Sequence, residues 1–261
     1  MQTVADVTVD QLLCFLMAFV RITSMIAVLP ILGSRGTPVT VKLGLSVILT
    51  MILFPLLAVR VLEIPTGLFS FSVLVAKELF IGITMGFAAS LIFAILQYGS
   101  YIMDQEMSFT FAETFDPMTE TSTTPIAQLN AVIFSVMFLI LGGHRLLIMA
   151  MANAFEIIPL GSVRFNAGPI AWQMTRMTGA IFNVGLAFAA PVVVTLIITT
   201  AVLGIIARTA PQLNIFIVGL PLRIGLGFLL IVTCLPQFFA FFEGMVQTMN
   251  RDIHMLLRLM A

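Results

Sequence analysis

Charged side chains are scarce in this sequence of 261 residues. Asp, Glu, Lys and Arg make up 9% of the chain, whereas 60% of it is hydrophobic and the mean hydropathy is +1.14. A soluble domain typically carries about a quarter charged residues. This chain therefore cannot cover a surface that faces water, and its exterior must face membrane lipid or other apolar protein.

The sequence also lacks an excess of charge of either sign, because 12 basic residues balance 12 acidic ones. Without a net field, nucleic-acid binding is not expected. Cys14 and Cys234 lie in apolar runs away from any histidine, which favours packed apolar residues over metal ligands or a disulfide. His144 and His254 stand without a nucleophile or a carboxylate cluster, so we expect no cofactor, no metal and no enzymatic activity.

Long apolar runs are what the sequence has in abundance. Prolines within several of them predict kinked or broken helices. The predicted fold class is all-α, a polytopic membrane protein of long kinked helical hairpins. The runs long enough to cross about 30 Å of hydrocarbon lie at 12–32, 43–62, 68–98, 126–151, 178–206 and 212–242. The last twenty residues mix apolar and polar positions at helical spacing, which predicts an amphipathic helix at an interface or against a partner.

A few residues inside these runs point to contacts between helices. Gly82 and Gly86 lie one turn apart and predict a close approach of another helix, although chance in a glycine-rich membrane chain is the alternative. Arg21, Lys77 and Glu78 each cost on the order of 2.5–3.5 kcal/mol at a helix centre. Neighbours on a helix point about 100° apart, so Lys77 and Glu78 need partners elsewhere. Pairs between helices or at a subunit interface are favoured over an ion relay or snorkelling.

The segment 99–125, GSYIMDQEMSFTFAETFDPMTETSTTP, is both acidic and rich in phenylalanine and methionine. A simple connecting loop does not need three phenylalanines, because their exposure to water is unfavourable, and the acids oppose burial in lipid. The composition fits a water-filled interior closed by apolar side chains, where dewetting stops ion flow. A loop folded onto the protein's own surface is the alternative.

Several motifs resemble the FliR family of flagellar export-apparatus components, whose virulence counterpart is SctT. The order of the elements agrees with that family over essentially the whole chain. The residues of the motif Arg208 to Leu222 favour the flagellar branch. The motifs are Pro30 to Arg35 (PILGSR), Val41 to Leu45 (VKLGL), Ser108-Phe109, Phe115-Asp116-Pro117, Gly143-His144-Arg145, Leu160-Gly161 and Arg208 to Leu222 (RTAPQLNIFIVGLPL).

The resemblance implies a structural subunit of an export gate for unfolded flagellar substrates. The gate would be assembled with FliP and FliQ, and FlhB and FlhA are further partners. Its expected place is the inner membrane at the flagellar basal body, displaced toward the periplasm. A single domain over 1–261 would contain a FliP-like part at about 1–170 and a FliQ-like part at about 171–261.

The resemblance also implies a plug loop inside the gate, at about 104–120 in this chain. The candidate plug residues are Phe109, Phe111, Phe115 and Met107. A virulence secretion subunit is the nearest alternative function. A secondary transporter is a more distant alternative. Such a transporter would show inverted repeats and paired polar sites at mid-membrane, and neither is seen in this sequence.

Overall fold

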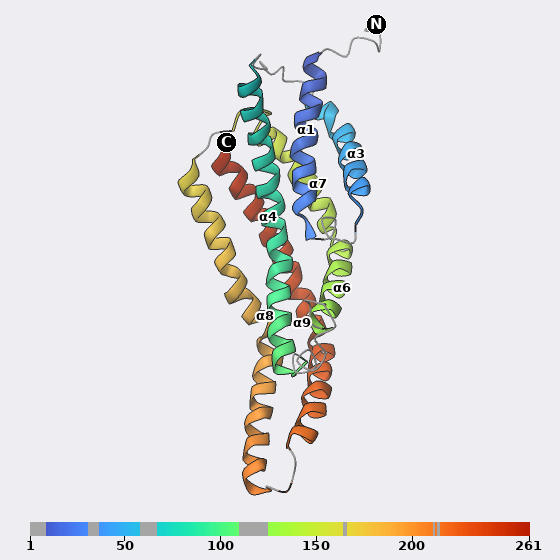
Figure 1. The fold of residues 1–261 in the computed structure, drawn as a ribbon, viewed down its shortest axis with the longest axis vertical. Coiled ribbons are helices and arrows are strands. Elements are labelled where there is room, and N and C mark those ends of the chain that lie inside the picture. The colour runs from blue at the N-terminus through green and yellow to red at the C-terminus, as the bar shows by residue number, and fades with distance from the viewer. Residues whose placement is uncertain are drawn as a thin grey trace. The chain divides into compact units, whose positions relative to one another are not determined.

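Every regular element in the described part of the chain is an α-helix. The computed structural model describes residues 9–30, 37–57, 67–109, 125–163, 166–210, 212 and 215–261. The all-α prediction is confirmed. The helices (Figure 1) are α1 (Val9–Val28), α3 (Val39–Leu57), α4 (Leu68–Glu106), α6 (Pro125–Ile140), α7 (Gly143–Ile157), α8 (Ala167–Thr209) and α9 (Ile215–Met260).

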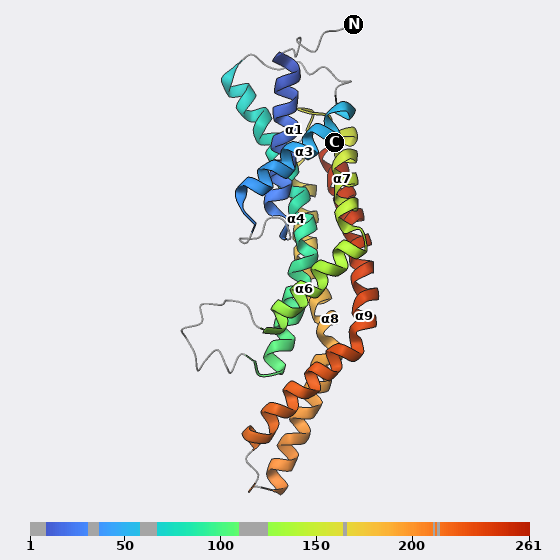
Figure 2. The same cartoon turned by 90° about the vertical axis from the view of Figure 1, so that its right-hand side faces the viewer.

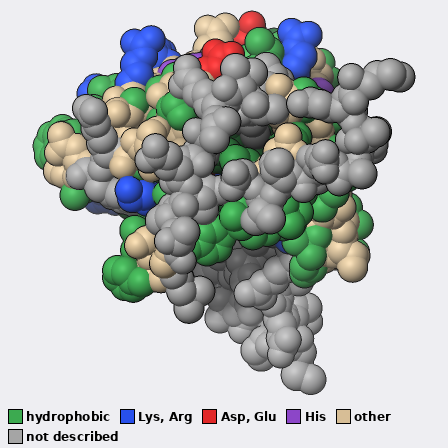
Figure 3. Space-filling view, turned by 90° about the horizontal axis from the view of Figure 1, so that it is seen from above, with side chains coloured by type: hydrophobic (Ala, Val, Ile, Leu, Met, Phe, Trp, Pro, Cys, Tyr) green, Lys and Arg blue, Asp and Glu red, His purple; other side chains and the backbone are tan. Residues whose placement is uncertain are grey.

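The length and composition of these helices make the chain a polytopic membrane protein, as predicted. Four helices, α1, α4, α8 and α9, are long and apolar enough to cross a membrane, and the bent pair of α6 and α7 adds a fifth if it is one span. Large apolar side chains such as Phe69 and Trp172 are mostly exposed. Figure 3 shows hydrophobic side chains at the surface between the few charged ones. Such a surface suits lipid or a protein partner.

The predicted runs differ in their bounds from the helices. The run 126–151 is broken into α6 and α7, which bend by 62°. Gly142 at the break has φ 70°, a left-handed conformation that glycine adopts without steric strain. The run 43–62 corresponds to the shorter α3. In contrast, α9 continues to Met260 and includes the predicted amphipathic helix as its last turns.

Polar side chains inside the apolar helices bond largely to their own backbone. Ser46 donates to the carbonyl oxygen of Lys42, Thr84 to that of Phe80, and Thr195 to that of Pro191, each at 2.8 Å. These hydroxyl groups therefore need no partner from another helix, which makes them compatible with an apolar environment.

The chain divides into two compact units. The first consists of Met1–Leu91, Gly142–Met177 and Gln247–Ala261, and the second of Ile92–Leu141 and Thr178–Val246. Consequently α4, α8 and α9 each contribute to both units. The predicted division into FliP-like and FliQ-like parts rests on the resemblance alone and stays a prediction.

Each unit has its own core. In the first unit α1 packs along α3 (Figures 1 and 2), and its buried side chains include Met17 and Ile22. In the second unit an aromatic cluster is centred on Phe188, whose ring centroid lies 5.5 Å from that of Phe134 and 4.6 Å from that of Phe238. Aromatic pairs at such distances stabilise a core beyond their area burial.

Candidate functional site

Asp104 ties the end of α4 to the beginning of α6 in the second unit. Its side chain is fully buried, and its carboxylate accepts hydrogen bonds from the backbone N–H groups of Ile126 at 3.0 Å and Ala127 at 2.9 Å. The first N–H groups of a helix have no partner within the helix, and its N-terminus favours negative charge. Asp104 therefore caps α6 and joins its beginning to the end of α4.

A second polar contact lies one turn away on both helices. The amide nitrogen of Asn130 donates to the hydroxyl oxygen of Ser100 at 2.8 Å, and both side chains are buried. Ser100 precedes Asp104 by four residues, and Asn130 follows Ile126 by four, so each pair shares one face of its helix. Together the two contacts hold α4 and α6 in one register.

The chain turns sharply after α4. Ser108 has φ 65°, which is unusual for a residue other than glycine. The Phe109 N–H donates to the Asp104 carbonyl oxygen at 3.1 Å, which closes the helix end with a left-handed turn. Arg223 of α9 donates through Nη1 to the Ser108 hydroxyl at 3.2 Å. This turn directs the chain out of α4 at a defined point.

The predicted plug residues fall into two groups. Met107 is fully buried against α9, and a Cβ added at Gly227 would lie 2.5 Å from its Cε. Phe109 is half-buried and meets the ring of Phe228 edge-on, with centroids 6.1 Å apart. Phe111 and Phe115 lie outside the described residues. A sealing role for any of them stays a prediction.

The buried charges of the first unit form one cluster. Arg21 Nε lies 2.6 Å from Glu78 Oε2, and both side chains are completely enclosed. The Arg21 Nη1 donates to the carbonyl oxygens of Ala154 at 3.3 Å and Ile158 at 3.0 Å. Glu78 Oε1 in turn accepts from the Gly161 N–H at 2.8 Å. The pair thus connects α1, α4 and the end of α7.

The physical role of this cluster follows from where α7 ends. The last carbonyl groups of a helix lack partners and carry partial negative charge, so a cation there is favourable. The Arg21 guanidinium also lies 4.5 Å from the centroid of the Phe155 ring, within cation–π range. Sequence reasoning singled out Arg21 and Glu78 and marked Pro159-Leu160-Gly161 as a break, but it did not predict that the end of α7 is their partner.

Lys77 behaves differently from its neighbour. It is half-buried and forms no ion pair within the described residues, whereas Glu78 has its partner on another helix. Arg21 and Glu78 are therefore paired between helices of this chain. A role for Arg21, Lys77 or Glu78 at a contact between subunits stays a prediction.

Gly82 and Gly86 lie where α1 crosses α4 closely. A Cβ at Gly82 would overlap the Ser24 hydroxyl and the Arg21 carbonyl group, and one at Gly86 would lie 2.7 Å from the Met25 carbonyl oxygen. Because the two glycines have no side chains, α1 can approach α4 closely, as in other helix crossings with small residues at the contact. Because Glu78 is one turn before Gly82, the same crossing brings it to Arg21.

The chemistry open to these groups is limited. Among the residues that the structure describes, no group of three His, Cys, Asp or Glu could hold a metal ion. The polar clusters instead fix helix ends and crossings. The arrangement can hold α4 and α6 together and resist separation of the helices.

Comparison with known proteins gives a consistent result. Residues 12–249 match the family described as "Bacterial export proteins, family 1". The chain is 30% identical over 242 residues to the flagellar biosynthetic protein FliR of Escherichia coli (strain K12), which covers 91% of this chain and 92% of that protein. It is 29% identical over 236 residues to FliR of Bacillus subtilis (strain 168), covering 88% and 89%. It is 24% identical over 232 residues to the secretion system apparatus protein SsaT of Salmonella typhimurium, covering 88% of each.

Proposed function

The chain belongs to bacterial export proteins, family 1, as a FliR homologue, and from this premise we propose that it is a structural subunit of the flagellar protein export gate. The family assignment made from sequence motifs is thereby confirmed. In the proposed role the chain forms, with FliP and FliQ, an inner-membrane channel for unfolded flagellar substrates. FlhB and FlhA are further proposed partners, and the protein performs no chemistry of its own.

The anchored base of the segment 104–120 is the observation that carries this proposal. Asp104 and the turn at Ser108 fix where the chain leaves α4, and the cap on α6 fixes where it returns. A plug must be held at its ends while its apolar middle closes the passage. Phenylalanine side chains in such a place stop ion flow by dewetting the pore.

The decisive experiment replaces Phe109, Phe111 and Phe115 together with alanine in the assembled gate and measures ion conductance across a planar bilayer. We expect the variant to conduct continuously, whereas the parental gate stays closed. The matched control replaces three exposed phenylalanines outside the segment, Phe69, Phe182 and Phe239. Unchanged conductance in the first variant would remove the plug assignment and leave the family assignment intact.

A virulence secretion subunit is the second candidate, favoured by the similarity to SsaT. The two functions separate in a complementation test, in which this gene replaces FliR in a non-motile deletion strain. We expect swimming to return, because the identity to two FliR proteins is higher, at 30% and 29%. Rescue of virulence secretion without motility would favour the second candidate.

A further inference from the structure

Arg223 is the one charged residue that the sequence has between Arg208 and Glu243. A charged side chain in so apolar a helix as α9 is costly, so it indicates a specific task. Arg223 donates through Nη1 to the Ser108 hydroxyl at 3.2 Å. Its Nε is buried and has no acceptor among the residues that the structure describes. The partner of this guanidinium therefore lies at the point where the chain leaves α4.

Two further residues of α9 contact the same point. Gly227 lies one turn after Arg223 on the same face of the helix, and Met107 fills the space that its missing side chain leaves, since an added Cβ would lie 2.5 Å from the Met107 Cε. Phe228 meets the ring of Phe109 edge-on at 6.1 Å. Figures 1 and 2 both show the end of α4 beside α9. We call these three residues of α9 the exit seat.

The backbone at Ser108 explains why a seat is needed. Its φ of 65° is left-handed, and that conformation is sterically costly for a residue with a side chain. Helices that end in this conformation usually have glycine there. Serine keeps the turn only if other contacts hold it, and the hydroxyl that glycine would lack is the acceptor of Arg223. Arg223 thus compensates for a turn that the local sequence disfavours.

We propose that the exit seat positions the first residues of the plug, and that Arg223 is its main positioning residue. The proposal rests on the proposed function, in which the segment 104–120 is the plug. Met107 is fully buried and Phe109 half-buried, so the seat holds the chain on both sides of Ser108. Without the seat, these residues separate from α9, and the gate leaks.

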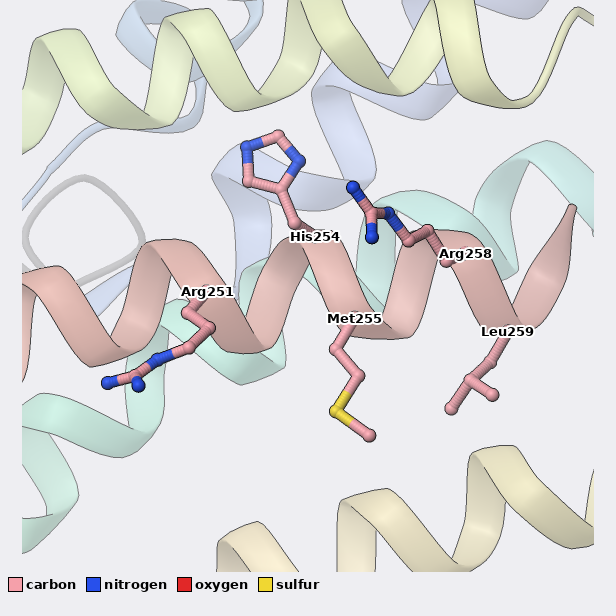
Figure 4. Close-up of a pocket in the computed structure, with 5 residues that line it drawn as sticks. All are labelled: Arg251, His254, Met255, Arg258 and Leu259. Atoms are coloured by element: carbon pink, nitrogen blue, oxygen red, sulfur yellow. The ribbon is translucent and has the colours of Figure 1, made fainter.

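A second arginine of α9 provides the matched control. Arg251 lines a groove together with Met255 and Leu259, on the same side of the helix (Figure 4). It is exposed and donates through Nη2 to the hydroxyl of Thr248, which belongs to the same helix, at 3.2 Å. Its replacement therefore removes a charge from α9 without touching the exit of α4.

The first measurement is hydrogen–deuterium exchange over residues 104–109 in the gate assembled with FliP and FliQ. We expect R223M to speed this exchange on the order of 10-fold, because a hydrogen bond from a charged group is lost. R223K keeps a donor and should restore slow exchange, and R251M should exchange as the parental chain does. G227A should act like R223M by displacing Met107, whereas G225A should change nothing, since no atom lies within 4 Å of its added Cβ.

The second measurement is ion conductance of the same gates across a planar bilayer. R223M and G227A should leak, whereas R223K, R251M and G225A should stay closed. S108A should also leak, and R223M/S108A should leak no more than S108A does, because residues that act through one contact are not additive. A merely structural role for Arg223 would instead make the two changes add.

Two results would overturn the proposal. Unchanged exchange over 104–109 in both R223M and G227A would show that α9 does not hold the exit of α4. Faster exchange in a gate that stays closed, while the triple phenylalanine variant leaks, would show that the seat does not position the plug. If the triple variant stays closed as well, the proposed function fails, and exchange alone decides whether the seat holds residues 107–109. If R223M does not assemble, the pair G227A and G225A decides in its place.

Discussion

At the scale of single residues, the buried side chain of Arg21 makes several contacts of different kinds. It is enclosed with Glu78 as its charge partner and with two carbonyl oxygens of α7 as further acceptors. Replacing Arg21 with methionine would leave the Glu78 carboxylate buried without a counter-charge. Breaking a buried pair in this way costs about 3–5 kcal/mol. We expect a correspondingly lower free energy of unfolding, measured by thermal or denaturant unfolding in detergent.

The double variant R21M/E78M separates the ion pair from simple packing. Replacing a buried pair with apolar side chains is often neutral, so the double variant should recover most of the lost stability. Lys77→Met is the matched control, because Lys77 is half-buried without an ion pair in the described residues. Equal loss in the single and double variants would contradict the electrostatic account. Sequence reasoning could identify Glu78 as needing a partner but could not name it, since local pattern does not encode which helices cross.

At the scale of elements, the crossing of α1 and α4 depends on two missing side chains. Gly82→Ala and Gly86→Ala should each destabilise the first unit by about 1–3 kcal/mol, because added atoms in a packed contact force the helices apart. Gly179→Ala is the control, since no atom lies within 4 Å of its added Cβ. That change should be neutral or slightly stabilising, because alanine favours helix. Equal effects at all three positions, read by thermal unfolding, would sink this explanation.

The link between α4 and α6 leads to a different expectation. Asp104→Ala should destabilise the chain by about 1–2 kcal/mol through the lost cap of α6. If the segment 104–120 is the plug, the same variant should raise ion leak in the assembled gate. Gln105→Ala, an exposed neighbour, should change neither quantity. A destabilised gate that stays closed would show that Asp104 supports the fold without positioning the plug.

The helices themselves were largely predictable, because the length of each apolar run can be read directly from the sequence. The predicted run 68–98 ends before the helix does, at Glu106, because acidic residues such as Asp104 and Glu106 are typical of loops between apolar helices. Asp104 is tolerated inside α4 only because the N–H groups of α6 satisfy its carboxylate. The bend at Gly142 lies in a run that was predicted as one segment, although Gly142 and Gly143 are followed there by the polar residues His144 and Arg145. A tertiary contact decided the first case, and the local left-handed conformation of Gly142 decided the second.

At the scale of the whole molecule, the described surface is too apolar for a chain that works alone. Phe69 is 82% exposed, Trp172 72% and Ile217 70%, and charged residues are only 9% of the sequence. Lipid can cover such side chains, but so can neighbouring subunits, and the proposed gate supplies both. We therefore expect the protein to accumulate severalfold more in membranes when FliP and FliQ are produced with it. Quantitative immunoblotting of membranes measures this, with a lactose permease as the unrelated control. The same yield and melting temperature with and without FliP and FliQ would contradict assembly with them, because burial against partners stabilises the folded chain.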